Sequence, residues 1–361
     1  MREKCFLADL FDMGTALLRR LPAETAHGLA LGALARGLGP RRPATSDPRL
    51  RSVFCGRTIP VPVGVSAGFD KNALAIGGVF ALGTGFVEVG GITPRPQAGN
   101  PRPRLFRLSA DRAAINRMGF NNDGLETVAQ RLEAWRAGSA NDLPVGVNLA
   151  ANADSDDPAH DFEMLVSRLA PLADFLTVDI SCPNTANGQM FLDPDRLRDL
   201  LARLNGVRDA ASGKRPAMLV KLAPDIDNKA LDILLEIIIA ASVDGITVSN
   251  TTVARPETLL SPESAERGGL SGRPLFERST AMLHHVYRQT GGAVPLVGVG
   301  GIGSGADAYA KIRAGASVVQ LYTALIFEGP GLIGRIARDL SALLARDGFA
   351  SVTDAIGADH C

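Results

Sequence analysis

The chain has 361 residues, 46% of them hydrophobic, and its 38 basic and 38 acidic residues give a formal net charge of zero. This balance gives no overall electrostatic reason to bind nucleic acid, and no nucleic-acid partner is expected. The four cysteines, at positions 5, 55, 182 and 361, form no C-x-x-C pair, so neither a metal site nor a disulfide framework is predicted. Scattered cysteines fit a reducing cytosolic setting.

Residues 1–40 differ from the rest of the chain. Two apolar helical stripes, around Leu7–Leu21 and Ala26–Leu34, flank the turn-like LPAET, and the pattern breaks from Gly37 to Pro43. One interpretation is a helical cap on the rest of the fold; the other is an amphipathic helix pair with an apolar slot, lying against lipid. No uninterrupted apolar stretch reaches the roughly 18 residues that a spanning helix needs, so any membrane contact is expected to be peripheral.

From Val61 onward, short apolar β-rich runs alternate with helical patterns such as 195–210 and 228–241. The runs cover 61–68, 85–91, 143–150, 175–181, 217–223, 244–250, 294–300 and 317–323. Nearly continuous apolar character indicates strands buried on both faces of a parallel sheet. Eight such units predict an α/β fold of the (β/α)8 barrel type for residues 41–361, with a doubly wound sheet as the alternative. The long connections 92–122 and 251–273 are expected at the C-terminal face, where barrels build their active sites.

The glycine-rich GVGGIG, residues 298–303, matches the dinucleotide fingerprint G-x-G-x-x-G. It follows the seventh strand rather than the first, and no acid ends the next strand, which disfavours a Rossmann interpretation. In a barrel, the loops after strands 7 and 8 commonly form a phosphate site at a helix N-terminus. The helix opening near Ser304, together with Tyr322 and Thr323, therefore predicts a cofactor that bears a phosphate.

Two lysines fall at predicted strand ends. Lys71 lies in SAGFDKN (66–72), where small residues permit the close approach of a flat ring, and Lys221 lies inside the apolar VKLAPD. A buried lysine needs a partner. An anionic reduced flavin would supply one, and the alternative is a structural ion pair with Asp179.

Asparagines recur at the predicted strand ends and offer both donors and acceptors to a pyrimidine-like ring. They are Asn116, Asn121, Asn122, Asn148, Asn184 and Asn250. Cys182 follows strand 4 and is held by Pro183. Such a thiol is either inert packing or a base, and a pKa near ~8.5 lets it accept a proton more readily than a hydroxyl.

Together these motifs resemble dihydroorotate dehydrogenases, specifically the quinone-dependent, membrane-associated class 2 enzymes. The likeness runs from LPAETAHGLAL through SAGFDKN, TPRPQAGNPRPRLFRL, INRMGFNN, SCPNT, VKLAPD and VGVGGIGSG to VTDAIGADH. The resemblance implies one FMN per chain across the top of the barrel. Its contacts would be Ala67, Gly68, Phe69, Asp70, Lys71, Gly91, Asn148, Asp179, Lys221, Ser249, Gly272, Gly301, Tyr322 and Thr323.

The resemblance also implies oxidation of (S)-dihydroorotate to orotate in pyrimidine synthesis, with Cys182 as the catalytic base. The substrate would be held by Lys71, Asn116, Arg117, Met118, Gly119, Phe120, Asp179, Asn184, Asn250 and Thr251. Quinone would reoxidise the flavin through residues 1–40, in a tunnel lined by His27, Arg107 and Tyr322. A monomer on the cytoplasmic side of the cell membrane is expected.

The sequence departs from this family at several positions. Cys182 stands where class 2 enzymes carry serine, Asp179 replaces an asparagine, Gly91 a hydroxyl residue and Ser249 a threonine, and ANGQMFLDP (186–194) lacks the usual GLR-type sequence. Two other hypotheses therefore stand beside the first. One is a paralogous flavin oxidoreductase acting on a related cyclic amide. The other is a flavin-binding or membrane-peripheral protein without turnover, against which Lys71, Cys182, Asn184 and Lys221 argue.

Overall fold

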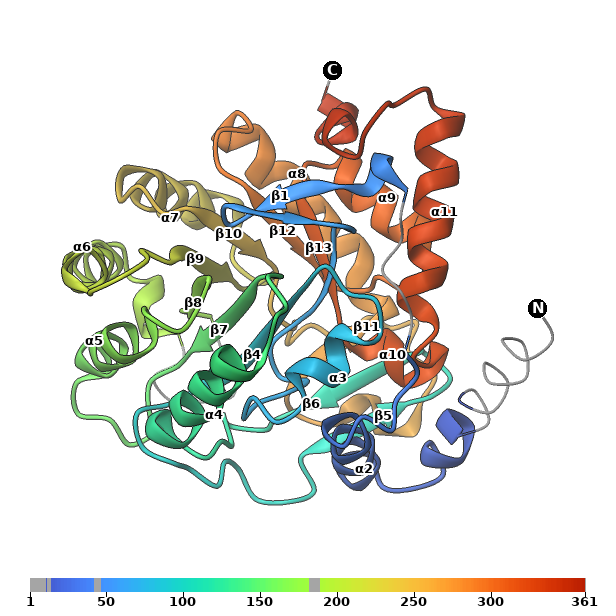
Figure 1. Ribbon diagram of the computed structural model, residues 1–361, viewed down its shortest axis with the longest axis horizontal. Coiled ribbons are helices and arrows are strands. Elements are labelled where there is room, and N and C mark those ends of the chain that lie inside the picture. Colours follow the sequence, from blue (N-terminus) through green and yellow to red (C-terminus); the bar gives the residue numbers. More distant parts are fainter. Residues whose placement is uncertain (1–10, 12–13, 42–46, 182–188, 361) are drawn as a thin grey trace.

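Eight parallel strands close into a barrel in the computed structural model, which describes residues 11, 14–41, 47–181 and 189–360 (Figure 1). The strands are β3 (Val63–Val65), β4 (Phe86–Ile92), β7 (Val145–Leu149), β8 (Phe175–Asp179), β9 (Ala217–Leu222), β10 (Gly245–Val248), β12 (Leu296–Val299) and β13 (Val318–Leu321). All eight predicted runs are strands. The pairing of β13 with β3, with Val319 opposite Val63, closes the ring, so the barrel is confirmed and the open sheet is excluded.

Helices surround the barrel (Figure 1). They are α3 (Ile76–Phe80), α4 (Leu125–Gly138), α5 (Pro158–Leu169), α6 (Pro194–Ala210), α7 (Asn228–Ala240), α8 (Phe276–Thr290), α9 (Gly305–Arg313), α10 (Thr323–Glu328) and α11 (Leu332–Arg346). Single 3-10 turns are η1 (Pro48–Leu50), η2 (Met190–Leu192), η3 (Pro262–Ala265), η4 (Arg273–Leu275), η5 (Thr353–Ala355) and η6 (Ala358–His360). The predicted helices 195–210 and 228–241 are α6 and α7. Asp193 and Asp227 cap them by accepting backbone N–H groups, which fixes where each helix begins.

A hairpin that was not predicted packs against one group of core residues. Its strands β1 (Ser52–Phe54) and β2 (Arg57–Ile59) pair antiparallel. Phe54 packs its ring 4.7 Å from Phe86 and 5.2 Å from Phe175, measured between centroids. These buried aromatic rings belong to a core cluster separate from the main one.

The two long connections form a second sheet. Strands β5 (Leu105–Leu108) and β6 (Ala113–Asn116) come from the first connection and β11 (Gly269–Gly272) from the second, in the antiparallel order β11-β6-β5. Buried Leu108, Ile115 and Leu270 form its own small core. Distant loops therefore become rigid walls, which suits them to position side chains.

The N-terminal segment packs through α2 (Ala23–Ala35) near α3 and β5. Arg104 is buried and donates to Glu24 at 2.7 Å, which ties α2 to the loop before β5. Leu17 and Leu29 are 64% and 53% exposed. The second predicted stripe lies in a helix as expected, whereas Leu7 and Leu10 of the first lie outside the described residues.

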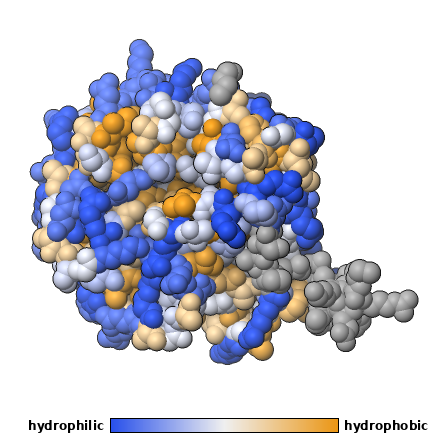
Figure 2. All heavy atoms as spheres, turned by 45° about the horizontal axis from the view of Figure 1, so that its top comes forward, coloured by the Kyte–Doolittle hydropathy of each residue, from blue (hydrophilic) through white to orange (hydrophobic). Residues whose placement is uncertain are grey.

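The described part of the chain contains no helix long and apolar enough to cross a membrane. On the face drawn in Figure 2, hydrophilic side chains predominate, and hydrophobic ones occur in small groups between them.

Candidate active site

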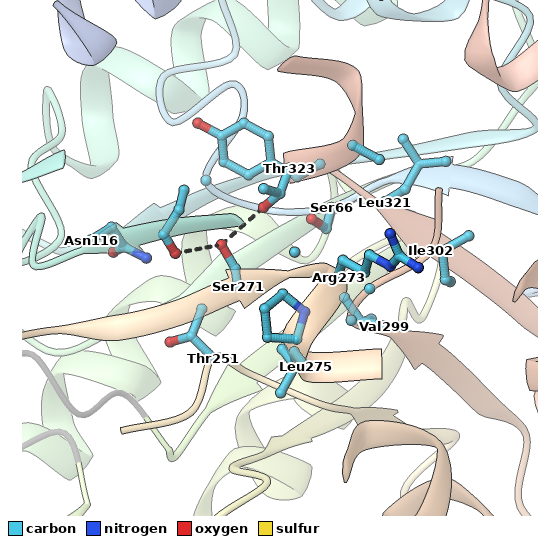
Figure 3. Close-up of a pocket in the computed structure, with 18 of the residues that line it drawn as sticks. Ser66, Asn116, Thr251, Ser271, Arg273, Leu275, Val299, Ile302, Leu321 and Thr323 are labelled. Carbon is cyan, nitrogen blue, oxygen red and sulfur yellow. Dashed lines mark hydrogen bonds between the residues drawn. The ribbon is translucent and has the colours of Figure 1, made fainter. Parts of the chain in front are cut away.

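A cavity of about 980 Å³ opens at the C-terminal ends of the barrel strands. Every strand of the barrel contributes to its wall at or just beyond its end. The contributors include Ser66, Gly91, Asn148, Asp179, Lys221, Ser249, Val299 and Leu321. Figure 3 shows Ser66, Val299 and Leu321 facing Ser271 and Arg273 of the second sheet and its following turn. The site therefore lies where the barrel fold predicts it.

Most of the predicted site residues line this single cavity. They are His27, Ala67, Gly68, Lys71, Gly91, Asn116, Met118, Gly119, Phe120, Asn148, Asp179, Lys221, Ser249, Asn250, Thr251, Gly272, Gly301, Tyr322 and Thr323. Phe69, Asp70, Arg107 and Arg117 are not among the lining residues. Cys182 and Asn184 lie outside the described residues.

The four residues outside the lining make structural contacts, and those of Asp70, Arg117 and Phe69 lie beside the cavity. Asp70 accepts the backbone N–H groups of Leu74 and Ala75 at 2.9 and 2.7 Å, so it shapes the loop that carries Lys71. Arg117 pairs with Glu266 at 2.7 Å and lies over the Phe106 ring. Phe69 packs edge-on against His27, with ring centroids 5.4 Å apart.

The glycine-rich loop forms a close-fitting cradle before α9. Gly301 has φ +75°, and a Cβ there would lie 2.5 to 2.7 Å from Phe276 atoms, so only glycine fits. Ser304 caps α9 by accepting the Asp307 N–H, as the predicted helix start requires. A glycine-rich backbone and a helix N-terminus together suit an anion, although the Gly303 N–H already donates to Asp307 Oδ2 at 2.9 Å. The loop before α9 therefore suits a ligand that carries a phosphate.

Ser271 completes this end of the cavity and was missed from the sequence. Its hydroxyl accepts from Thr323 Oγ1 at 2.9 Å and donates to the Ala114 carbonyl, as the dashed lines in Figure 3 show. Because β11 was hidden in a long connection, no sequence pattern placed Ser271 beside the end of β13.

A polar group beneath the cavity was also missed. Glu88 is 1% exposed and accepts from Gln320 Nε2 at 2.6 Å and from Asn148 Nδ2 at 3.3 Å. Because Asn148 Nδ2 donates to Glu88, the oxygen of the Asn148 amide points away from Glu88. The signal was present: each of Glu88 and Gln320 interrupts an otherwise apolar strand run.

Two lysines bring positive charge to the cavity. Lys71 Nζ donates to the Gly68 carbonyl at 2.7 Å, and burial lowers the pKa of Lys71 to about 8. Lys221 Nζ lies 3.6 Å from Asp179 Oδ2, which confirms the ion pair that was one of the two sequence interpretations. The ion pair does not exclude an anionic ligand, because both residues also line the cavity.

An aromatic group joins α2 to the cavity. Tyr322 packs 5.5 Å from Phe69 and 5.9 Å from His27, measured between ring centroids. Burial lowers the pKa of His27 to about 4 and raises the pKa of Tyr322 above its ordinary value. Both side chains are therefore neutral near pH 7, which suits an uncharged ligand. Nearby, Arg107 donates to the Arg19 carbonyl at 2.6 Å.

The family model described as dihydroorotate dehydrogenase matches residues 49–344 of the chain. This match covers the barrel and the second sheet.

The chain belongs to the dihydroorotate dehydrogenase family.

Relatives that are similar to this chain over nearly its whole length carry the name of the same family. The chain is 49% identical to "Dihydroorotate dehydrogenase (quinone)" of Rhodospirillum rubrum, covering 98% of this chain and 96% of the relative. It is 46% identical to the mitochondrial protein of that name from Mus musculus, covering 96% of this chain and 89% of that protein. The crystal structure of DHODH from Eimeria tenella in complex with ferulenol superposes with a TM-score of 0.90 at 39% identity, covering 93% of this chain and 95% of that one. Within the described residues, no cluster of histidine, cysteine and carboxylate groups could hold a metal ion.

Proposed function

We propose that this protein oxidises dihydroorotate to orotate and passes the electrons to a quinone, in pyrimidine biosynthesis, with FMN bound in the cavity. The observation that carries the proposal is the 49% identity to a quinone-dependent dihydroorotate dehydrogenase over 98% of the chain. The relatives reported above are named for dihydroorotate, so the alternative substrate has no support of its own.

The residues fit FMN at both ends of the cavity. Gly301 and the Ser304-capped helix would hold the phosphate, and Thr323 would add a hydroxyl there. Gly68 leaves room over the Tyr322 ring, since a Cβ at position 68 would lie 3.7 Å from Tyr322 Cε1. When bound, FMN supplies an acceptor for the hydride that leaves the substrate.

The substrate is proposed to sit against the asparagine-rich wall. Asn116 on β6 and Asn250 after β10 line the cavity and present amides, which can bind the alternating N–H and C=O edge of the ring. Lys71 supplies a cation for the substrate carboxylate. Cys182 would take the proton from the substrate carbon next to the carbonyl. Asn116 and Asn250 lie at or just beyond strand ends, which hold them in fixed positions, as removal of a proton and a hydride from neighbouring carbons requires.

Quinone is proposed to approach beside α2, through residues 1–40. The neutral His27 and Tyr322 side chains lie at the cavity wall, and Arg107 has a buried Nε with no hydrogen-bond partner among the described residues. The exposed leucines of this segment would rest on the cytoplasmic surface of the cell membrane as a peripheral contact. The working unit is proposed to be a monomer.

A steady-state assay with different acceptors tests the proposal. We expect orotate formation, followed by its ultraviolet absorbance, when dihydroorotate is supplied with a short-chain ubiquinone. Fumarate and NAD⁺ should support at most about a hundredth of that rate, since the neutral His27 and Tyr322 side chains suit an uncharged acceptor. Equal rates with fumarate would contradict quinone as the acceptor, and no orotate with any acceptor would contradict the substrate.

A further inference from the structure

The ion pair between Asp179 and Lys221 places two opposite charges side by side in the cavity wall. Asp179 ends β8, and Lys221 stands directly opposite it on β9. Asp179 is 6% exposed, and its Oδ2 lies 3.6 Å from Lys221 Nζ. Among the described residues, no other carboxylate lies within ion-pairing distance of Lys221. The negative charge of Asp179 therefore opposes the positive charge that Lys221 presents to any ligand in the cavity.

The contacts of Asp179 suit a carboxylate. Its Oδ1 accepts from the Ser181 N–H at 3.2 Å, from Ser181 Oγ at 3.1 Å and from Asn250 Nδ2 at 3.2 Å. Its Oδ2 faces the Lys221 ammonium and Asn250 Nδ2, the latter at 3.3 Å. Every one of these neighbours is a donor, and a carboxylate is an acceptor at both oxygens. The local structure is thus built around the negative charge.

We infer that the Asp179 carboxylate keeps the reduction potential of the bound flavin low, by offsetting the positive charge that Lys221 brings to the cavity. The inference rests on the proposed function, because it requires a flavin in this cavity. Reduction adds electrons to the ring, so a cation in the wall favours the reduced flavin and an anion disfavours it. With both charges present, their effects largely cancel. Reduction by the substrate becomes less favourable, and electron transfer to the quinone becomes more favourable by the same amount.

The test measures the midpoint potential of the flavin-loaded protein without substrate or quinone. Each protein is reduced slowly in the presence of a reference dye, and both absorbances are followed. Asp179→Asn should shift the equilibrium toward reduced flavin at least tenfold, which raises the potential of a two-electron couple by about 30 mV. Asp179→Ala removes the same charge without placing an amide against the donors and should move the potential in the same direction. Lys221→Met should lower it.

A matched control is Asp225→Asn. The Asp225 carboxylate follows the neighbouring strand, accepts the Val253 N–H at 2.8 Å and pairs with Arg278 at 3.2 Å, but it does not line the cavity. Its removal should change the equilibrium less than threefold. An unchanged or lower potential in both Asp179 variants, or an equal rise in Asp225→Asn, would overturn the inference. Purified protein that binds no flavin would instead refute the proposed function, whereas unshifted potentials in protein that still oxidises dihydroorotate would refute only this inference.

Discussion

The Tyr322 hydroxyl lies 3.4 Å from His27 Nδ1, so the residue after barrel strand β13 meets helix α2 of the N-terminal segment. The two residues are separated by 295 positions in the chain. Through this contact the segment that precedes the barrel reaches the cavity wall. An electron acceptor that enters beside α2 would therefore arrive next to the residue that closes the cofactor site.

His27→Ala is expected to slow reoxidation by quinone about tenfold or more while leaving reduction by dihydroorotate unchanged. The substitution removes the ring that packs against Phe69 and Tyr322 on the side of α2. Stopped-flow mixing of prereduced protein with ubiquinone measures the first step, and anaerobic mixing with substrate measures the second. His160→Ala is the control, because that histidine lies on α5 and pairs with Glu163 at the surface. Loss of both half-reactions in His27→Ala would contradict a role confined to the quinone.

Replacing the exposed leucines of the N-terminal segment should abolish vesicle binding without affecting the chemistry. Leu17, Leu21 and Leu29 are 64%, 37% and 53% exposed. Replacing all three with glutamate therefore adds negative charge to the side that is proposed to face lipid. Cosedimentation with phospholipid vesicles measures binding, and anaerobic bleaching checks the active site. Val53, Met164 and Ile233 are comparably exposed on other elements, and their glutamate variants should bind vesicles like the wild type. Equal binding by the Leu17, Leu21 and Leu29 variant would contradict the membrane contact.

Folding stability should rise with pH because of Lys311. This side chain is fully buried on α9, donates to Ser279 Oγ at 2.6 Å and lies over the Phe276 ring, and burial lowers its pKa to about 7. The unfolded chain, with an ordinary lysine pKa near ~10.5, binds more protons between these values, so stability increases as pH rises from 7 to 10.

Urea unfolding at pH 7.5 and 9.5 checks this expectation. The gain in unfolding free energy should be about 2.5 kcal/mol larger in the wild type than in Lys311→Met, at ~1.4 kcal/mol per pH unit for one proton taken up on unfolding. Asp307 and Glu277 act in the opposite direction and raise the Lys311 pKa, and both remain in the variant. Lys71, whose pKa is about 8, contributes the same sign in both proteins and cancels in the comparison. Identical gains would show that Lys311 is not charged differently in the two states.

Gly301→Ala is expected to weaken FMN binding at least tenfold. It should also lower the free energy of unfolding by roughly 1–3 kcal/mol. The new Cβ would lie 2.5 Å from Phe276 Cβ and 2.6 Å from its Cα, and the backbone there cannot move aside cheaply. Fluorescence titration of FMN into the apoprotein measures the affinity. Gly206→Ala, in α6 with nothing within 4 Å, should keep FMN affinity and gain about 0.5–1 kcal/mol. Unchanged FMN affinity in Gly301→Ala would show that the glycine loop does not hold the cofactor.

The barrel could be predicted from the sequence because its strands are buried on both faces. Runs such as 217–223 and 317–323 are almost wholly apolar, and the helices between them carry clear capping residues such as Asp227. The ion pair of Lys221 with Asp179 could also be predicted as one of two alternatives, because Asp179 ends β8 and Lys221 is the last residue but one of the neighbouring strand β9.

The second sheet, and the pairing of the polar groups below the cavity, could not be predicted in this way. Strand β11 pairs with β6, and Ser271 lies beside Ala114, 157 residues away in the chain, so no local pattern reveals the contact. Glu88 and Gln320 are separated by 232 positions, and each alone is a polar residue in an apolar strand. Pairings of this kind depend on closure of the barrel.

The most direct test is anaerobic mixing of the purified yellow protein with dihydroorotate, with the visible absorbance of the flavin followed over time. We expect the absorbance to bleach within seconds in the wild type. Cys182→Ala should keep its FMN and bind orotate but bleach about 100-fold or more slowly, as expected for loss of a general base. Unchanged colour in flavin-loaded wild-type protein would contradict the central claim that this cavity oxidises dihydroorotate.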